Sequence, residues 1–323
     1  MQEAMIKRAK ELLADGTVDR VMGWKKGEFA YDHTPAVFTS AQDLEENFVC
    51  NELTSANLSK YLVKETVRDG KVLAFLKPCD TYSFNQLVKE HRIDREKVYV
   101  IGIPGGPKLD IEKIKAKGIT GILNLKNENY TLKIETLYGI SEMPFYEAIS
   151  VKCSNCKSKK HVVYDELIGD DGEVLDSGRF DMVEKLENMT AQERYDFWRS
   201  ELSKCIRCNA CRNVCPACTC EKCVFDNPSS GVENKAAANS FEENMFHIIR
   251  AFHVAGRCTD CGECSRVCPQ NIPLHLLNRK FIKDINELYG TYQAGENTTD
   301  KAPLNDYKMD DCEANVVHER GVE

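Results

Sequence analysis

The chain has 323 residues, 42% of them hydrophobic, and a formal net charge of −8. That length is enough for two or three domains that each bury a core. The acidic balance disfavours nucleic acid as a partner, because neutralising phosphates needs clustered Lys and Arg. No run approaches about eighteen consecutive apolar residues, and the N-terminus lacks a basic stretch followed by an apolar one, so we predict neither a membrane span nor a signal peptide. We expect a cytoplasmic location.

Helix and strand signals alternate along the first 135 residues. Helices are expected at residues 4–13 and 55–63, and strands at residues 18–22, 72–76 and 98–103. Between the last two strands, Phe84, Leu87 and Val88 have the spacing of one helix face. Two strands joined by a helix form a βαβ unit with parallel strands. We therefore predict an α/β domain with a parallel βαβ core over residues 1–160.

Two hairpins are expected to add to this core. An apolar stretch, a polar turn and an alternating stretch follow one another over residues 121–134, which is the pattern of a hairpin. A second hairpin is predicted at residues 162–174, with its turn at the glycines of residues 169–172. Residues 161–189 are accordingly assigned to a hairpin and linker.

The C-terminal part of the chain has helical signals. Thr190 with Glu193, and Ser240 with Glu243, have the spacing of a capping box, and each pair precedes an apolar-periodic segment. We predict a mostly helical domain over residues 190–290. The remaining segment, residues 291–323, has eight acidic and three basic residues and few periodic apolar positions. It is expected to be a tail that is mobile or bound to a partner.

Sixteen cysteines in a chain without a secretory signal indicate metal binding, because cytosolic thiols are kept reduced. Two runs repeat the spacing C-x₂-C-x₂-C-x₃-C followed by proline, which is typical of ferredoxin-type [4Fe–4S] sites. In such sites the fourth cysteine of each run ligates the other cluster. The spacing therefore predicts one cluster held by Cys205, Cys208, Cys211 and Cys268, and a second held by Cys258, Cys261, Cys264 and Cys215. Structural zinc, the alternative, favours paired C-x₂-C knuckles.

Other cysteines lie outside these two runs. Cys218, Cys220 and Cys223 follow the first run, and they are either buried thiols or ligands of another metal. The upstream cysteines are Cys50, Cys79, Cys153 and Cys156, which are enough for a third [4Fe–4S] cluster or a zinc ion. Cys79 directly follows a predicted strand, at the edge where parallel sheets gather ligand sites.

Three glycines close the second strand of the βαβ unit and the turn after it. Gly102, Gly105 and Gly106 would allow a flavin or another phosphate group to approach backbone amides, and the alternative is an ordinary tight turn. We find no persuasive pairing of a nucleophile with a base, so no catalytic side chain is predicted.

Several of these motifs resemble those of a known family, the β subunits of coenzyme F420 hydrogenases and dehydrogenases. The resembling residues are Lys77, Pro78, Cys79 and Asp80 after one strand, Gly102, Ile103 and Pro104 at the end of the next, the pair Cys153 and Cys156, and then Tyr164, Asp165, Leu167, Ile168 and Gly169. The two-cluster segment is similar to ferredoxin-like subunits of heterodisulfide reductase. The resemblance covers about residues 40–290.

The resemblance implies cofactors and ligands for the N-terminal domain. Members of this family bind a flavin (FAD or FMN) and a [4Fe–4S] cluster there. Related sequences commonly carry cysteines where this chain has Gly105 and the pair Thr54 and Ser55. The family pattern therefore leaves Cys50, or an oxygen of Asp80, as the fourth ligand beside Cys79, Cys153 and Cys156.

Together these features favour an electron-transfer subunit of a larger, soluble oxidoreductase from an anaerobe. It would relay single electrons between a flavin, nicotinamide or F420 site and the redox centre of a partner subunit of a hydrogenase, dehydrogenase or heterodisulfide reductase-like complex. One alternative is a flavin-dependent F420 or NAD(P) oxidoreductase subunit that carries its own flavin. Another is a docking subunit stabilised by zinc.

Overall fold

A computed structural model describes residues 1–157, 160–173, 178–227, 240–306 and 309. The chain divides into two compact units. The first consists of Met1–Phe84 and Ile93–Ser177, and the second consists of Asn85–Arg92 and Gly178–Glu323. Within the described ranges, none of the helices combines the length and the apolar character that crossing a bilayer demands.

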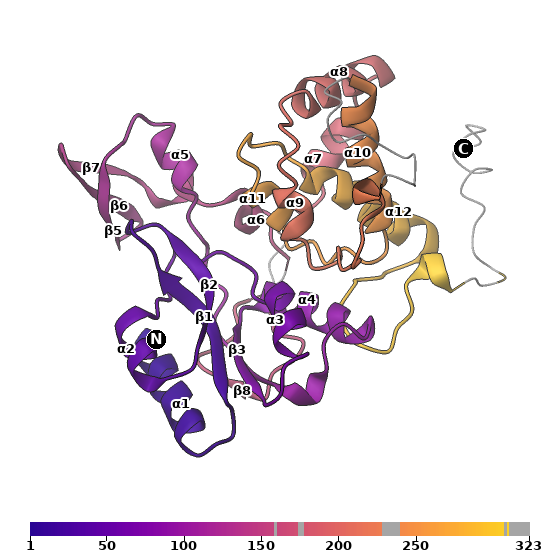
Figure 1. Ribbon diagram of the computed structural model, residues 1–323. Coiled ribbons are helices and arrows are strands. Elements are labelled where there is room, and N and C mark those ends of the chain that lie inside the picture. Colours follow the sequence, from indigo (N-terminus) through magenta and orange to yellow (C-terminus); the bar gives the residue numbers. More distant parts are fainter. Residues whose placement is uncertain (158–159, 174–177, 228–239, 307–308, 310–323) are drawn as a thin grey trace. The chain divides into compact units, whose positions relative to one another are not determined.

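The first unit is built on a five-stranded mixed sheet with the order β2-β1-β3-β4-β8 (Figure 1). Its strands are β1 (Arg20–Lys26), β2 (His33–Phe38), β3 (Val72–Leu76), β4 (Val98–Gly102) and β8 (Glu166–Leu167). Neighbouring strands run parallel except for β2, which is antiparallel to β1. The predicted α/β class of this domain is confirmed, and the added antiparallel strand makes the sheet mixed.

Helices connect and flank these strands. The helices up to the end of the first unit are α1 (Gln2–Ala14), α2 (Ala41–Asn47), α3 (Ser59–Glu65), α4 (Pro78–Lys89), η1 (Arg95–Lys97), α5 (Ile111–Lys115), η2 (Phe145–Ala148) and α6 (Val151–Ser154). Every residue of β3 is buried, as expected of a parallel strand covered on both faces. Helix α4 joins β3 to β4, so the βαβ unit is present. Its first residue is Pro78, whose fixed φ suits the start of a helix.

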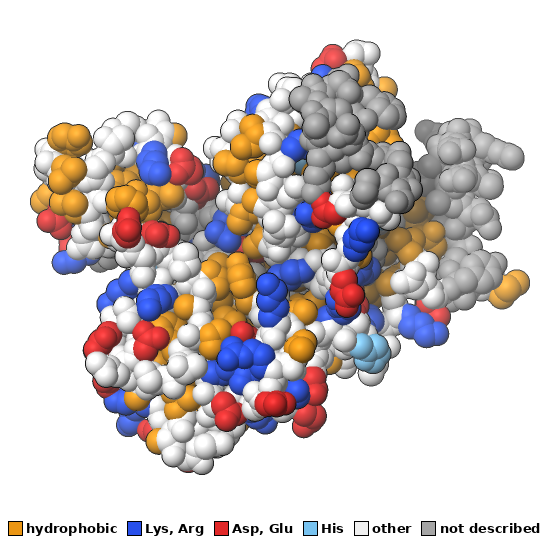
Figure 2. Space-filling view, viewed as in Figure 1, with side chains coloured by type: hydrophobic (Ala, Val, Ile, Leu, Met, Phe, Trp, Pro, Cys, Tyr) orange, Lys and Arg blue, Asp and Glu red, His pale blue; other side chains and the backbone are white. Residues whose placement is uncertain are grey.

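A separate antiparallel sheet contains β5 (Ile122–Glu128), β6 (Thr131–Thr136) and β7 (Gly139–Pro144). The hairpin predicted at residues 121–134 is therefore confirmed. Its turn residues Asn129 and Tyr130 both have positive φ, which two-residue hairpin turns require. The inner face buries Leu132 and Ile134, and Figure 2 shows hydrophobic side chains on the exposed part of this sheet, where Tyr138 is 82% exposed.

The second predicted hairpin, at residues 162–174, is wrong in the part of that segment that the structure describes. The chain there forms β8, which runs parallel to β4. The carboxylate of Asp165 accepts a 2.7 Å hydrogen bond from the backbone N–H of Val100, and Glu166 accepts hydrogen bonds from Arg8 and Tyr99. These long-range contacts align the segment with β4. The described residues on the two sides of the glycine-rich turn do not pair with each other as strands of a hairpin.

The second unit is helical throughout its described part. It contains α7 (Asp181–Glu187), α8 (Ala191–Leu202), α9 (Ala210–Asn213), η3 (Val224–Asp226), α10 (Ser240–His253), α11 (Glu263–Arg266), α12 (His275–Tyr289) and η5 (Pro303–Asn305). The capping box predicted for Thr190 and Glu193 is present at the start of α8. The side chains of the second predicted box, Ser240 and Glu243, lie outside the described residues.

The expected acidic tail is described only in its first part. Up to Asp306 it packs on the second unit: the Tyr292 hydroxyl donates a 3.0 Å hydrogen bond to the carbonyl of Gly256, and Ala294 and Ala302 are buried. Residues 307–308 and 310–323, which include Cys312, lie outside the described residues, and whether this segment binds a partner stays a prediction.

Gly23 provides a test of the packing of the mixed sheet. A Cβ atom there would lie 2.5 Å from the ring of Phe48, which packs between Phe38 and Phe75. We expect Gly23→Ala to lower the free energy of unfolding of the first unit by about 1–3 kcal/mol. The added methyl group overlaps the Phe48 ring, so the ring or the backbone must move out of its packed position. Urea unfolding followed by Trp24 fluorescence measures this. Gly106→Ala is the control, since nothing lies within 4 Å of its Cβ position; equal stability of the two variants would contradict the prediction.

Candidate metal centres

Four cysteines from the two repeats line one cavity in the second unit. Cys205 and Cys208 reach it from the loop that leads into α9, Cys211 reaches it from α9 itself, and Cys268 reaches it from the segment after α11. The trailing cysteine of the second repeat is thus brought to the three leading cysteines of the first. Four thiols around one cavity are the donor set that a [4Fe–4S] cluster takes.

The other four cysteines of the repeats also lie near one another. A thiolate at Cys215 is close enough to Cys258, Cys261 and Cys264 to raise the pKa of each. Cys215 also packs against Cys258 in a small apolar cluster with Val254. Cys215 thus lies near the three leading cysteines of the second repeat, and the assignment of these four residues to one cluster stays a prediction.

The backbone of the two cysteine loops repeats one conformation. Arg207 and Asn209 flank Cys208 with φ of 55° and 61°, and Asp260 and Gly262 flank Cys261 with φ of 58° and 70°. Positive φ is uncommon for residues other than glycine, so its repetition marks a required turn. Turns of this kind direct backbone N–H groups towards an anion. In the first loop the N–H of Arg207 donates a 3.4 Å hydrogen bond to the Cys205 sulfur.

Burial controls the protonation of these thiols. Burial raises the pKa of Cys211 to about 11 and that of Cys264 to about 12, and it shifts the pKa of Cys258 in the same direction. Without a metal ion beside them, these thiols keep their protons at neutral pH. Because metal ligands must be thiolates, loading either group of cysteines releases protons.

The three further cysteines of this region differ in their surroundings. The N–H of Cys218 donates to the carbonyl of Cys215 at 3.1 Å, and its side chain packs beside that cysteine. Cys220 is exposed, and Cys223 directly precedes η3. Over the described ranges, no three Cys, His, Asp or Glu side chains converge closely enough to hold a single metal ion.

The upstream cysteines all lie in the first unit, around buried lysines. Cys50 and Cys153 lie near Lys108, whose backbone N–H donates a 3.4 Å hydrogen bond to the Cys153 sulfur. Cys79 lies near Cys156 and is the second residue of α4. The structure thus places Cys50 and Cys153 near one buried lysine and Cys156 near Cys79, which follows the carboxyl end of β3.

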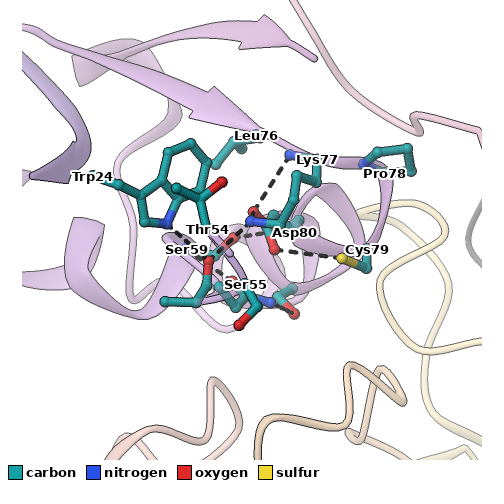
Figure 3. A network of polar contacts seen from close by, with 12 residues as sticks. Trp24, Thr54, Ser55, Ser59, Leu76, Lys77, Pro78, Cys79 and Asp80 are labelled. Atoms are coloured by element: carbon teal, nitrogen blue, oxygen red, sulfur yellow. Dashed lines mark hydrogen bonds and ion pairs between the residues drawn. The ribbon is translucent and has the colours of Figure 1, made fainter. Parts of the chain in front are cut away.

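Lys77 and Asp80 form a buried ion pair beside Cys79 (Figure 3). The Lys77 ammonium lies 2.8 Å from the Asp80 carboxylate, donates to the Ala56 carbonyl at 2.9 Å and lies 4.3 Å from the centre of the Trp24 ring. Burial raises the pKa of the Cys79 thiol, and Asp80 raises it further, whereas nearby Lys ammonium groups oppose the shift. The thiol donates to Asp80 at 3.6 Å.

Lys108 and Lys152 complete a group of three buried lysines with Lys77. Lys108 donates to the carbonyl of Asn51 at 2.8 Å, and Lys152 donates to the carbonyl of Ser55. Burial lowers the pKa of Lys108, and the positive charge of Lys77 lowers it further. Nothing in the sequence distinguishes Lys108 and Lys152, because an isolated lysine normally indicates an exposed position. This positive region suits an anionic centre with four thiolates.

The glycines proposed for a flavin or phosphate have different surroundings. A Cβ at Gly102 would lie 2.9 Å from Leu167 and 3.0 Å from the His161 ring, and one at Gly105 would lie 2.9 Å from Pro78. Internal packing therefore accounts for these two glycines. Only at Gly106 is the space open.

Comparison with known proteins first defines the class of the second unit. Residues 201–272 match the family model of the 4Fe-4S dicluster domain. The chain therefore carries a domain of the kind that binds iron–sulfur clusters, in agreement with the two groups of cysteines described above.

Similar proteins extend the likeness to most of the chain. The F420-dependent formate dehydrogenase subunit beta of Methanocaldococcus jannaschii is 24% identical over 90% of this chain and 90% of its own length. The F420-dependent formate dehydrogenase 1 subunit beta of Methanococcus maripaludis is 27% identical over 67% of this chain and 72% of its own. These similarities confirm the resemblance to F420 hydrogenase and dehydrogenase β subunits, and the expectation of an iron–sulfur electron-transfer protein.

A solved structure is also similar. A chain of the F420-reducing [NiFe] hydrogenase complex from Methanosarcina barkeri aligns with a TM-score of 0.37 and 14% identity. The alignment covers 48% of this chain and 58% of that one.

The buried ion pair beside Cys79 can be tested by a double-mutant cycle. Lys77→Met leaves the Asp80 carboxylate buried without its cation, so we expect the free energy of unfolding to fall by about 3–5 kcal/mol. Adding Asp80→Asn removes the uncompensated charge and should recover part of this loss. Urea unfolding of the single and double variants gives the coupling, and a double variant no more stable than Lys77→Met would show that charge pairing is unimportant here.

Proposed function

We propose that this chain is the iron–sulfur electron-transfer subunit of a cytoplasmic, multisubunit oxidoreductase of an anaerobe, with coenzyme F420 on the donor or acceptor side. One observation carries the proposal: Cys268 of the second repeat lines the same cavity as the three leading cysteines of the first. The names of the relatives, F420-dependent dehydrogenase β subunits, support the kind of complex and its partner subunits.

The cysteines of the second unit would hold two [4Fe–4S] clusters with crossed ligation. Cluster 1 would be held by Cys205, Cys208, Cys211 and Cys268, and cluster 2 by Cys258, Cys261, Cys264 and Cys215. When bound, each cluster supplies a one-electron redox centre. The two loops would supply backbone N–H groups to the cluster sulfurs, and the buried side chains would exclude water.

The upstream cysteines would hold a third [4Fe–4S] cluster. Cys79, Cys153 and Cys156 are the best candidates for its ligands, with Cys50 as the fourth. The three buried lysines beside them support this, because a cluster with four thiolates is anionic, and a buried anion needs positive charge nearby. Zinc at the same cysteines is the alternative.

A flavin in the first unit is the second candidate feature, and it would make the chain the site of hydride transfer. One relative that aligns with 90% of this chain is named as F420-dependent, and F420 is a hydride carrier. This name favours a flavin in the first unit. The open space at Gly106 would admit a phosphate group to backbone amides. A flavin absorbance band in the purified chain would support this role, and its absence after incubation with FAD or FMN would assign the hydride chemistry to a partner subunit.

Crossed ligation predicts which cluster each trailing cysteine affects. Cys215→Ser should alter the paramagnetic resonance signal of cluster 2 and leave that of cluster 1 intact, and Cys268→Ser should do the opposite. The two variants are matched, because each removes one trailing cysteine before proline. Damage confined to the cluster within the same repeat would contradict crossed ligation.

Metal content separates the hypotheses for the upstream cysteines. We expect about eight iron and eight sulfide per anaerobically reconstituted chain for two clusters, and about twelve of each with a third. The double variant Cys153→Ser with Cys156→Ser should lower iron by about four and stop electron flow from reduced F420. Cys220→Ser with Cys223→Ser is the control pair.

Two other results would contradict the proposed cluster content. Loss of zinc in place of iron, with electron transfer unchanged, would make the upstream site structural. A chain that holds zinc-bound thiolates and no sulfide would refute the electron-transfer function and leave a docking subunit.

A further inference from the structure

Helix α10 carries two buried polar side chains on its inner face. His247 and Arg250 are three residues apart, so they lie on the same side of the helix, and their exposed fractions are 1% and 2%. Neither belongs to a cysteine repeat. Histidine and arginine are rarely buried to this extent without partners, so both side chains need an explanation.

His247 lines the cavity of cluster 1. It shares the cavity wall with Cys205, Cys208, Cys211 and Cys268. Neither ring nitrogen has a hydrogen-bond partner in the part of the chain that the structure describes. An imidazole carries at least one N–H in either protonation state, so the ring has a hydrogen to donate into this cavity.

Arg250 lies near cysteines of both groups. Its guanidinium is the strongest charge acting on Cys211 of the first group and on Cys264 of the second, and Cys215 is also near. Within the described residues, none of its three side-chain nitrogens has a hydrogen-bond partner. A buried cation without a hydrogen-bond partner is costly, so this arrangement calls for an acceptor or a negative charge close to the guanidinium.

We propose that Arg250 and His247 are hydrogen-bond donors to the sulfurs of the two clusters and raise their reduction potentials, with Arg250 acting on both clusters and His247 on cluster 1. The inference rests on the proposed two-cluster function and deepens it. A cluster gains negative charge on reduction, so a cation or an N–H group directed at its sulfurs stabilises the reduced form. The planar guanidinium has five donors, which lets one side chain serve two neighbours.

The test is an anaerobic redox titration of the full-length, reconstituted chain, followed by paramagnetic resonance. Arg250→Gln should lower both midpoint potentials, and His247→Phe should lower that of cluster 1 alone. At a fixed ambient potential we expect the ratio of reduced to oxidised cluster to fall about tenfold, which for a one-electron centre corresponds to about 59 mV. Lys185→Met, which removes an exposed positive charge from α7, is the control and should change neither potential.

Two further measurements show that a change in midpoint potential does not come from cluster loss or from misassigned signals. Iron and sulfide are determined for every variant, and the Cys215→Ser and Cys268→Ser spectra identify the two signals. If Arg250→Gln does not retain its clusters, Arg250→Lys takes its place: the compact ammonium cannot serve both clusters at once, so one potential should fall and the other should stay.

The outcomes distinguish this inference from the proposed function. Clusters that are complete in the variants but have wild-type potentials would overturn the roles of Arg250 and His247 and leave the two-cluster function standing. A wild-type chain that takes up no iron and sulfide would overturn both.

Discussion

Positive charge buried beside thiols is the constraint on which both units depend. A cation removed from water costs several kcal/mol unless an anion or well-placed acceptors compensate it. In the first unit, Lys77 is compensated by Asp80, while Lys108 and Lys152 donate to backbone carbonyls. In the second unit, Arg250 has no such partner among the described residues and faces thiols. In each unit the positive charge lowers the pKa of neighbouring thiols and so opposes part of the rise that burial causes, which favours the thiolate that iron requires.

The backbone imposes a second constraint, at the cysteine loops. Left-handed residues on both sides of Cys208 and Cys261 curve each loop, so that the cysteines of one repeat and the trailing cysteine of the other can surround a common space. Under crossed ligation neither repeat completes a site by itself. With the proposed ligation the dicluster domain would be a single cooperative unit, in which the loss of one trailing cysteine would affect the partner repeat.

Much of this arrangement follows from local sequence. The apolar run of β3 and the capping box at Thr190 are local patterns, and both have the structure that they predict. Strand β8 could not be predicted, because its pairing depends on Asp165 and on residues distant in the sequence. The burial of Arg250 could not be predicted for a different reason. A charged residue in an amphipathic helix normally lies on the solvent-exposed face, and only the cysteines around Arg250 in the folded chain make its burial tolerable.

Helix α10 belongs to the insertion that separates the two cysteine repeats. The entropy of closing a loop grows only with the logarithm of its length, so each doubling of the insertion costs only about 0.6 kcal/mol. The proposed ligands therefore lie on segments with fixed spacing, whereas His247 and Arg250 lie on a segment whose length the cysteine spacing does not fix. Substitutions in this helix can therefore shift the driving force for electron transfer without changing a cluster ligand. Natural variation or protein engineering can then change the reduction potentials of the clusters separately from the cysteines on which cluster assembly depends.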